Sequence, residues 1–150
     1  MDTSTARPQH RILLVREWDS QTSGSGCCGR LGGADCDDWH PDSFARSRSL
    51  MEKMGGIYRA LRQELPVDTV EITVVDPRNM VWLVPTIMRD GRRRGMRAGV
   101  LWQQVRNGVR NGAIVVDGRA LPAADSAGPD VAVDAVLREL ARASDGQPPM

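Results

Sequence analysis

Two short apolar runs joined by a long amphipathic segment constrain the fold of this chain most. The runs RILLVREW (11–18) and TVEITVVD (69–76) are rich in β-branched residues and are bounded by turn-forming residues, which predicts two buried strands. Between them, apolar residues recur with helical spacing and mark one face of a helix: Phe44, Met51, Met54, Tyr58, Leu61 and Leu65. A strand, helix, strand order predicts parallel pairing of the strands through a right-handed crossover.

The predicted helix has identifiable ends and one internal weakness. Asp42 or Ser43 offers an N-cap, and Pro66 ends the helix. Gly55 and Gly56 lie inside it, and each glycine costs about 1 kcal/mol relative to alanine. Either the helix breaks at this pair, or another element packs closely against it.

The chain after the second strand predicts a helical region. Residues 78–90 are apolar but contain Pro85, which removes a helical hydrogen bond, so we expect a short or kinked helix there. Residues 100–109 have apolar side chains at helical spacing, and we expect a short helix that stops near Gly112.

A hairpin and a last helix complete the predicted fold. Within AIVVDGRAL (113–121), Asp117-Gly118 is a strong signal for a two-residue hairpin turn. Residues 130–143 form an amphipathic pattern that predicts a C-terminal helix. The fold class expected from these elements is α/β, with a strand-helix-strand unit followed by a helical region, a β-hairpin and a C-terminal helix.

Arginines crowd the segment RDGRRRGMR (89–97), which predicts a polar, solvated loop. Its arginines are Arg89, Arg92, Arg93, Arg94 and Arg97. Docking of this loop to an acidic partner protein or to phosphate is the second interpretation. The formal net charge of +1, with one Phe and one Tyr in the chain, disfavours nucleic acid as a partner.

Three cysteines, Cys27, Cys28 and Cys36, carry the most concentrated chemistry of the sequence. Adjacent Cα atoms lie about 3.8 Å apart, whereas disulfides prefer roughly 4.4 to 6.8 Å, so a bridge between Cys27 and Cys28 would be strained. The intervening GRLGGAD supplies three glycines, which let the chain fold back and bring Cys36 to either partner. We therefore expect one of the vicinal pair to attack a disulfide and Cys36 to resolve the product.

The same thiolates are an alternative ligand set for a soft ion. Cys27, Cys28 and Cys36 would converge on it, and His40 is a candidate fourth ligand, although a surface helix-cap role is favoured for His40. Sulfur and imidazole suit zinc, copper(I) or an iron–sulfur cluster.

A glycine pattern in the same segment matches a nucleotide-binding motif. Gly24, Gly26 and Gly29 spell G-x-G-x-x-G, which in dinucleotide-binding proteins joins a strand directly to a helix. Here residues 30–41 intervene without helical periodicity, so nucleotide binding is disfavoured.

The order of elements resembles the thioredoxin-like superfamily over about residues 11–143, with thiols between the first strand and a helix and a hairpin before the last helix. The vicinal pair with a third cysteine is most similar to the arsenic metallochaperones, whose three thiolates carry As(III). The resemblance implies a thioredoxin-like fold and thiol chemistry. There is no C-x-x-C pair, and Gly112 stands where thioredoxins place a cis-proline.

We expect one domain over residues 10–143, with flexible tails at 1–9 and 144–150. His10 stands at the junction of the two, and its side chain is assigned to the N-terminal tail. No apolar run is long enough to cross a bilayer, and the N-terminus lacks a signal-peptide core, so we expect a cytoplasmic protein.

The predicted function is cysteine-dependent thiol–disulfide or electron-transfer chemistry. The first alternative is a soft-metal, metalloid or iron–sulfur carrier that uses the same cysteines. The second is a noncatalytic accessory subunit that docks to a larger enzyme. In each case the expected partner is another protein, which serves as a redox partner or as a metal acceptor.

Overall fold

The computed structural model describes residues 8–16, 41–121 and 128–145 of the chain. The strands and helices follow one another in the predicted order, so the expected α/β class is confirmed. In chain order the elements are β1 (His10–Val15), α1 (Pro41–Glu64), β2 (Val70–Val75), α2 (Met80–Arg93), α3 (Ala98–Gly108), β3 (Ile114–Val116), β4 (Arg119–Ala120) and α4 (Pro129–Ser144).

The four described strands form one mixed sheet in the order β2-β1-β3-β4. β1 and β2 pair in parallel, with Leu13 opposite Thr73, which confirms the pairing predicted from the strand, helix, strand order. β3 runs antiparallel to β1 and places Val115 opposite Leu13, and β4 runs antiparallel to β3. β1 therefore has a strand neighbour on each side, and its last four residues, Ile12 to Val15, are apolar and buried.

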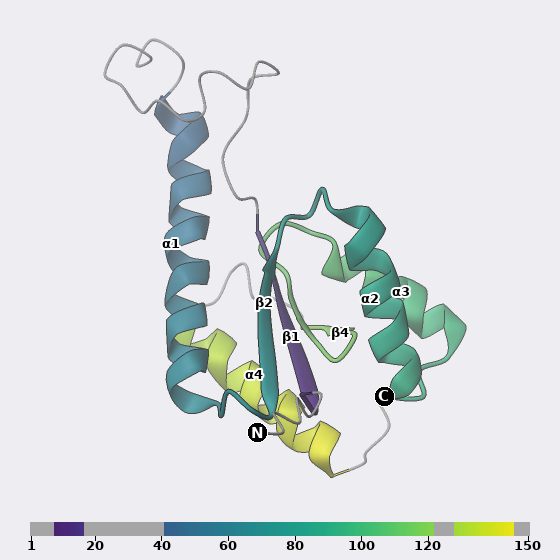
Figure 1. Cartoon of the computed structure of the whole chain (residues 1–150). Coiled ribbons are helices and arrows are strands. Elements are labelled where there is room, and N and C mark those ends of the chain that lie inside the picture. Colours follow the sequence, from purple (N-terminus) through teal and green to yellow (C-terminus); the bar gives the residue numbers. More distant parts are fainter. Residues whose placement is uncertain (1–7, 17–40, 122–127, 146–150) are drawn as a thin grey trace, which may run out of the picture.

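Helices cover both faces of the sheet, with α1 and α4 on one side and α2 and α3 on the other (Figure 1). Successive side chains of β1 point to opposite faces. Ile12 and Leu14 belong to the core under α1 and α4, whereas Leu13 and Val15 belong to the core under α2 and α3. The sheet thus separates two hydrophobic cores that share its central strand.

The glycine pair does not break α1, which runs for 24 residues. A Cβ atom built on Gly56 would lie 3.7 Å from Cγ of Pro129, in the first turn of α4. The second interpretation of the pair is therefore correct, because another helix packs against α1 at this point.

α2 corrects two predictions. It spans 14 residues and continues through Pro85 to Arg93, so of the expected short or kinked helix the short form is wrong, and residues 89–93 are helical rather than part of a loop. Pro85 is exposed, whereas Leu83 and Ile87 are fully buried against the sheet. Packing of this buried face offsets the hydrogen bond that Pro85 removes.

The hairpin turn follows the prediction and lies close to α2. Asp117 and Gly118 have φ angles of 47° and 81°, as a two-residue hairpin turn requires. A Cβ atom on Gly118 would lie 2.7 Å from the carbonyl oxygen of Ile87 and would overlap the backbone of Gly91. The turn reaches α2 this closely only because glycine occupies position 118.

Two predicted boundaries are also wrong. His10 is the first residue of β1 and not part of a tail. α3 ends at Gly108, ahead of Gly112, which has a φ of 87° and donates its N–H to the carbonyl of Val15 at 2.7 Å. Gly112 therefore connects the start of the hairpin to the end of the central strand.

Candidate functional site

The predicted thiol site lies outside the described residues. Cys27, Cys28, Cys36 and His40 all fall within residues 17–40, so their arrangement stays a prediction. Within the described ranges, no group of three or more His, Cys, Asp or Glu side chains is placed to hold a metal ion.

The C-terminal end of β1, which continues into residues 17–40, is hydrogen-bonded to the chain on both sides. Arg16 donates its backbone N–H to the carbonyl of Val75 at 2.9 Å, and Val15 donates to the carbonyl of Ala113 at 2.9 Å. Residues 17–40 then lead to α1, which begins at Pro41. In the sequence the cysteines therefore stand between the end of the central strand and the start of a long helix.

An apolar cavity of about 220 Å³ lies between α1 and the ends of β1 and β2. Leu14, Met54, Tyr58 and Val74 supply its apolar lining, with Arg16 and Arg59 among the other lining residues. Gly55 also lines it and leaves room, because a Cβ atom there would meet only the Arg59 guanidinium, at 3.7 Å. Ligand pockets usually measure roughly 300 to 1,000 Å³, so this cavity suits one apolar side chain better than a cofactor.

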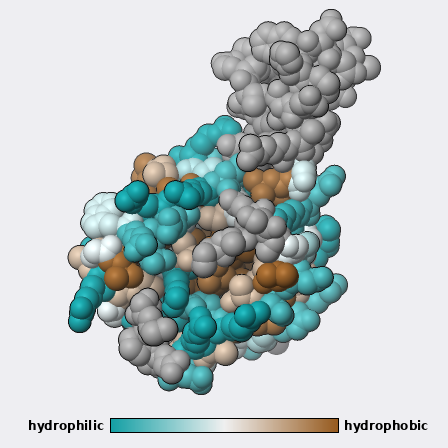
Figure 2. Space-filling model, turned by 180° about the vertical axis from the view of Figure 1, so that it is seen from behind, coloured by the Kyte–Doolittle hydropathy of each residue, from teal (hydrophilic) through white to brown (hydrophobic). Residues whose placement is uncertain are grey.

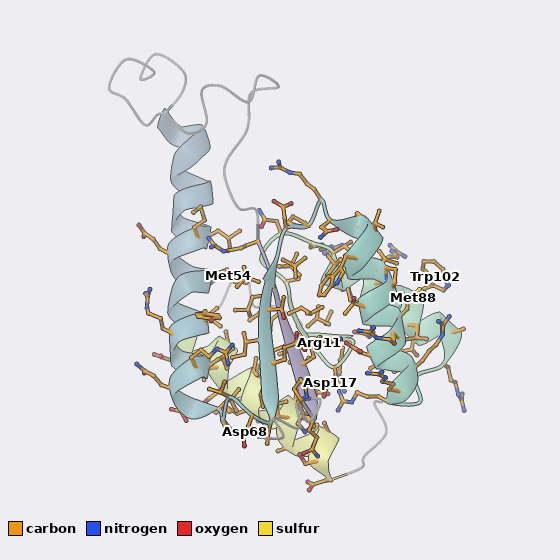
Figure 3. All side chains as sticks on the ribbon, viewed as in Figure 1. Arg11, Met54, Asp68, Met88, Trp102 and Asp117 are labelled. Atoms are coloured by element: carbon orange, nitrogen blue, oxygen red, sulfur yellow. The ribbon has the colours of Figure 1, made fainter. Side chains whose placement is uncertain are left out.

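A polar cavity, also of about 220 Å³, lies at the opposite end of the central strand, where β1 begins. Asp117 accepts a hydrogen bond from the backbone N–H of Arg11 at 2.7 Å. Its other carboxylate oxygen lies 2.8 Å from Nδ1 of His10. Figure 3 labels Arg11 and Asp117 at this end of β1. The hairpin turn is thereby bound to the first two residues of the central strand.

Arg11 joins this cavity to two further elements. Its Nε donates to Glu71 of β2 at 3.0 Å, and its Nη1 donates to the buried Asp90 of α2 at 3.1 Å. Burial alone would lower the pKa of Arg11, but the hydrogen bond to Glu71 and the charge of Asp90 outweigh it, so the pKa is raised. Arg11 is therefore a permanent cation that links β1, β2 and α2.

Glu139 of α4 is the most deeply buried charged side chain in the described part of the chain, with 2% of its surface exposed. It accepts a hydrogen bond from Nη1 of Arg94 at 2.9 Å. Arg119 and Arg142 lie 3.6 and 3.5 Å from its other carboxylate oxygen. The cluster fastens α4 to β4 and to the residue that follows α2.

The ion pairs of Arg11 and of Glu139 join separate elements of the fold and so have a structural role. Glu71, Asp90 and Glu139 are each paired with arginine, and no buried side-chain nitrogen or oxygen of the described residues lacks a hydrogen-bond partner. The sequence-based prediction missed the cluster, although Glu139 gave a signal by standing between Val136 and Leu140 on the apolar side of the last helix.

Comparisons with known proteins give no match: no family model, curated protein or solved structure matches this chain. The assignment of a function therefore depends on the sequence and on the geometry of the described residues. None of the described helices combines the length and the hydropathy that a membrane span requires.

Proposed function

We propose that this chain is a thioredoxin-like protein that carries out thiol–disulfide exchange or electron transfer through Cys27, Cys28 and Cys36. The observation that supports this most is where the thiols lie along the fold. The segment that holds all three cysteines connects the end of the central strand β1 to the N-terminus of α1. A position ahead of a helix N-terminus is expected to lower the pKa of a thiol, whereas Asp35, Asp37 and Asp38 oppose this at Cys36, so the vicinal pair beside Arg30 is the proposed attacking site.

The arrangement of the elements supports the thioredoxin-like part of the proposal. β1, α1 and β2 form a parallel unit, and the β3-β4 hairpin joins the sheet on the other side of β1 before the last helix. Helices lie on both faces of the sheet. A thioredoxin-like domain is expected to have this order and this pairing.

The proposed exchange has two steps. A thiolate of the vicinal pair attacks one sulfur of a partner's disulfide, so a mixed disulfide forms and the first partner thiolate leaves. The Cys36 thiolate then attacks the sulfur of the vicinal cysteine and displaces the second partner thiolate. The partner gains two electrons, and this chain retains a disulfide between Cys36 and one vicinal cysteine. Cys36 is the resolving residue because a bridge between adjacent cysteines is strained.

The number of cysteines supports a second candidate function. Three thiolates, with His40 as a fourth ligand, are the donor set of a carrier for zinc, copper(I), As(III) or an iron–sulfur cluster. A noncatalytic accessory role is the third candidate, in which the cysteines are dispensable and the fold only docks to a partner.

Trapping the mixed disulfide tests the exchange. Reduced protein is mixed with oxidised glutathione and analysed by intact-mass spectrometry. The Cys36→Ser variant is expected to accumulate a stable adduct with one glutathione, whereas the wild type releases the glutathione and closes its own disulfide.

Matched double variants identify the attacking residue. In the Cys36→Ser background, a second substitution, Cys27→Ser or Cys28→Ser, is expected to abolish the adduct in one case and to leave it in the other. If Cys36→Ser accumulates no more adduct than the wild type, Cys36 does not resolve and the proposed mechanism is wrong.

A further inference from the structure

The layer formed by α2 and α3 is strongly basic. Residues 77–110 contain eight arginines and a single carboxylate, that of Asp90, which is a net charge of +7 in a chain whose formal net charge is +1. The remainder of the chain is therefore acidic. Such segregation produces a positive potential over one layer of the fold, and this potential attracts acidic partners.

Four of these eight arginines form ion pairs with described residues: Arg78 with Asp76, Arg89 and Arg93 with Asp90, and Arg94 with Glu139. Asp90 is buried and bound to Arg11, and Arg94 is bound to Glu139. Arg92, Arg97, Arg106 and Arg110 are exposed, and none of them forms an ion pair with another described residue. The positive charge of the layer is thus available to a partner.

Apolar side chains are exposed on the same layer. Six large hydrophobic side chains of the described residues are exposed, and four belong to α2 or α3, namely Met80, Val81, Trp82 and Trp102. Val81 is 91% exposed and Trp102 is 56% exposed. In Figure 3 Trp102 lies on the side of the helices that faces away from the sheet. Tryptophan and arginine are the residues that contribute most to binding at protein interfaces.

The last helix, α4, provides a surface for comparison. Seen from behind, hydrophobic groups are interspersed with hydrophilic ones over the described residues (Figure 2). On α4, the exposed Val131 is close in sequence to both signs of charge, with Arg138 paired to Asp134 at 3.6 Å. α4 therefore offers an exposed valine and exposed charged side chains without the excess of positive charge.

We infer that the outer face of α2 and α3 binds an acidic protein segment with apolar anchors. Its carboxylates pair with the exposed arginines, whose planar guanidinium groups suit bidentate pairing. Its apolar side chains contact Val81 and Trp102. A symmetric dimer through this face does not fit, because two faces with this charge repel each other. The aliphatic Met80 and Val81 favour a protein over a nucleic acid, since they match apolar side chains and not phosphates.

A labelled peptide of alternating Glu and Leu is a direct probe of this face, with fluorescence anisotropy on the full chain as the measurement. The peptide is expected to bind, and its affinity is expected to fall as salt is raised. A peptide with Ser in place of Leu keeps the charge and removes the anchors, and it is expected to bind about tenfold more weakly. Equal binding of the two peptides would show plain charge attraction and would overturn the inference.

Variants locate the binding site. Two double variants are each expected to lower the affinity for the Glu/Leu peptide about tenfold: Val81→Ser with Trp102→Ser, and Arg92→Gln with Arg106→Gln. The matched controls on α4, Val131→Ser and Arg138→Gln, are expected to leave its affinity unchanged. Circular dichroism confirms that each variant is folded. Equal losses in the α4 controls would refute the assignment to α2 and α3.

Competing partners are tested with the same variants. Absence of peptide binding, or tighter binding of phosphatidylglycerol vesicles or of oligothymidylate, would overturn the inference in favour of no site, a membrane surface or a nucleic acid. Cysteine-to-serine variants are expected to bind the peptide as the wild type does. Failure of the thiol mechanism would therefore leave this inference standing, and the reverse also holds.

Discussion

Replacement of Gly118 by alanine is expected to lower the free energy of unfolding by about 3 kcal/mol. Gly118 has a φ of 81°, a conformation that costs a residue with a Cβ roughly 1 to 2 kcal/mol. The new Cβ would also lie 2.7 Å from the carbonyl oxygen of Ile87 and overlap the backbone of Gly91. Overpacking of this kind adds about 1 to 3 kcal/mol, because the turn and α2 must move apart.

Gly95 provides a matched control for this substitution. Its φ is 74°, and a Cβ atom built there meets nothing within 4 Å. Gly95→Ala therefore isolates the conformational cost, about 1 kcal/mol. Urea unfolding of both variants gives the comparison. Equal losses in Gly118→Ala and Gly95→Ala would mean that the hairpin turn does not pack against α2 in solution.

The second large effect is expected at Glu139. The Glu139→Leu substitution removes a carboxylate that is 2% exposed and leaves Arg94, whose side chain is 13% exposed, without its closest partner. Breaking a buried ion pair in this way costs about 3 kcal/mol or more. Chemical denaturation measures the loss.

A double variant distinguishes loss of the ion pair from loss of packing. Glu139→Leu with Arg94→Leu removes both charges, and it is expected to be more stable than Glu139→Leu alone. The exposed pair of Asp134 and Arg138 is the surface reference, and Asp134→Asn is expected to change stability by no more than about 0.5 kcal/mol. If Glu139→Leu costs as little as Asp134→Asn, the buried cluster does not stabilise the fold.

The parts of the fold that local patterns determine were predicted well. β1 and β2 are β-branched runs, and α1 and α4 have apolar residues at helical spacing, so propensity and burial agree in them. Parallel pairing followed from connectivity. The Asp117-Gly118 turn followed from the need for positive φ angles at both positions.

The errors arose where distant contacts override local preference. The arginine-rich end of α2 has the composition of a loop, yet Asp90 is bound by Arg11, which lies 79 positions away in the sequence. His10 was assigned to a tail because its neighbours in the sequence are polar, and the contact with Asp117 lies 107 positions away. Local patterns in a single sequence do not predict contacts between residues that are so far apart along the chain.

The candidate site could likewise be predicted only in part from the sequence. Cys27, Cys28, Cys36 and His40 were found by residue type and spacing alone, and they remain predictions because they lie outside the described residues. What the structure adds is their setting, between the end of β1 and the start of α1. The ion pairs near the start of β1 and the exposed face of α2 and α3 could be identified only from the structure.

A count of free thiols tests the central claim most directly. The protein is purified with and without oxygen, its metal content is measured, and thiols are titrated under denaturing conditions before and after reduction. The proposed redox function predicts one free thiol in the oxidised protein and three after reductant, with no bound metal. Three free thiols in both states, or a bound metal that is lost in Cys28→Ser, would contradict it.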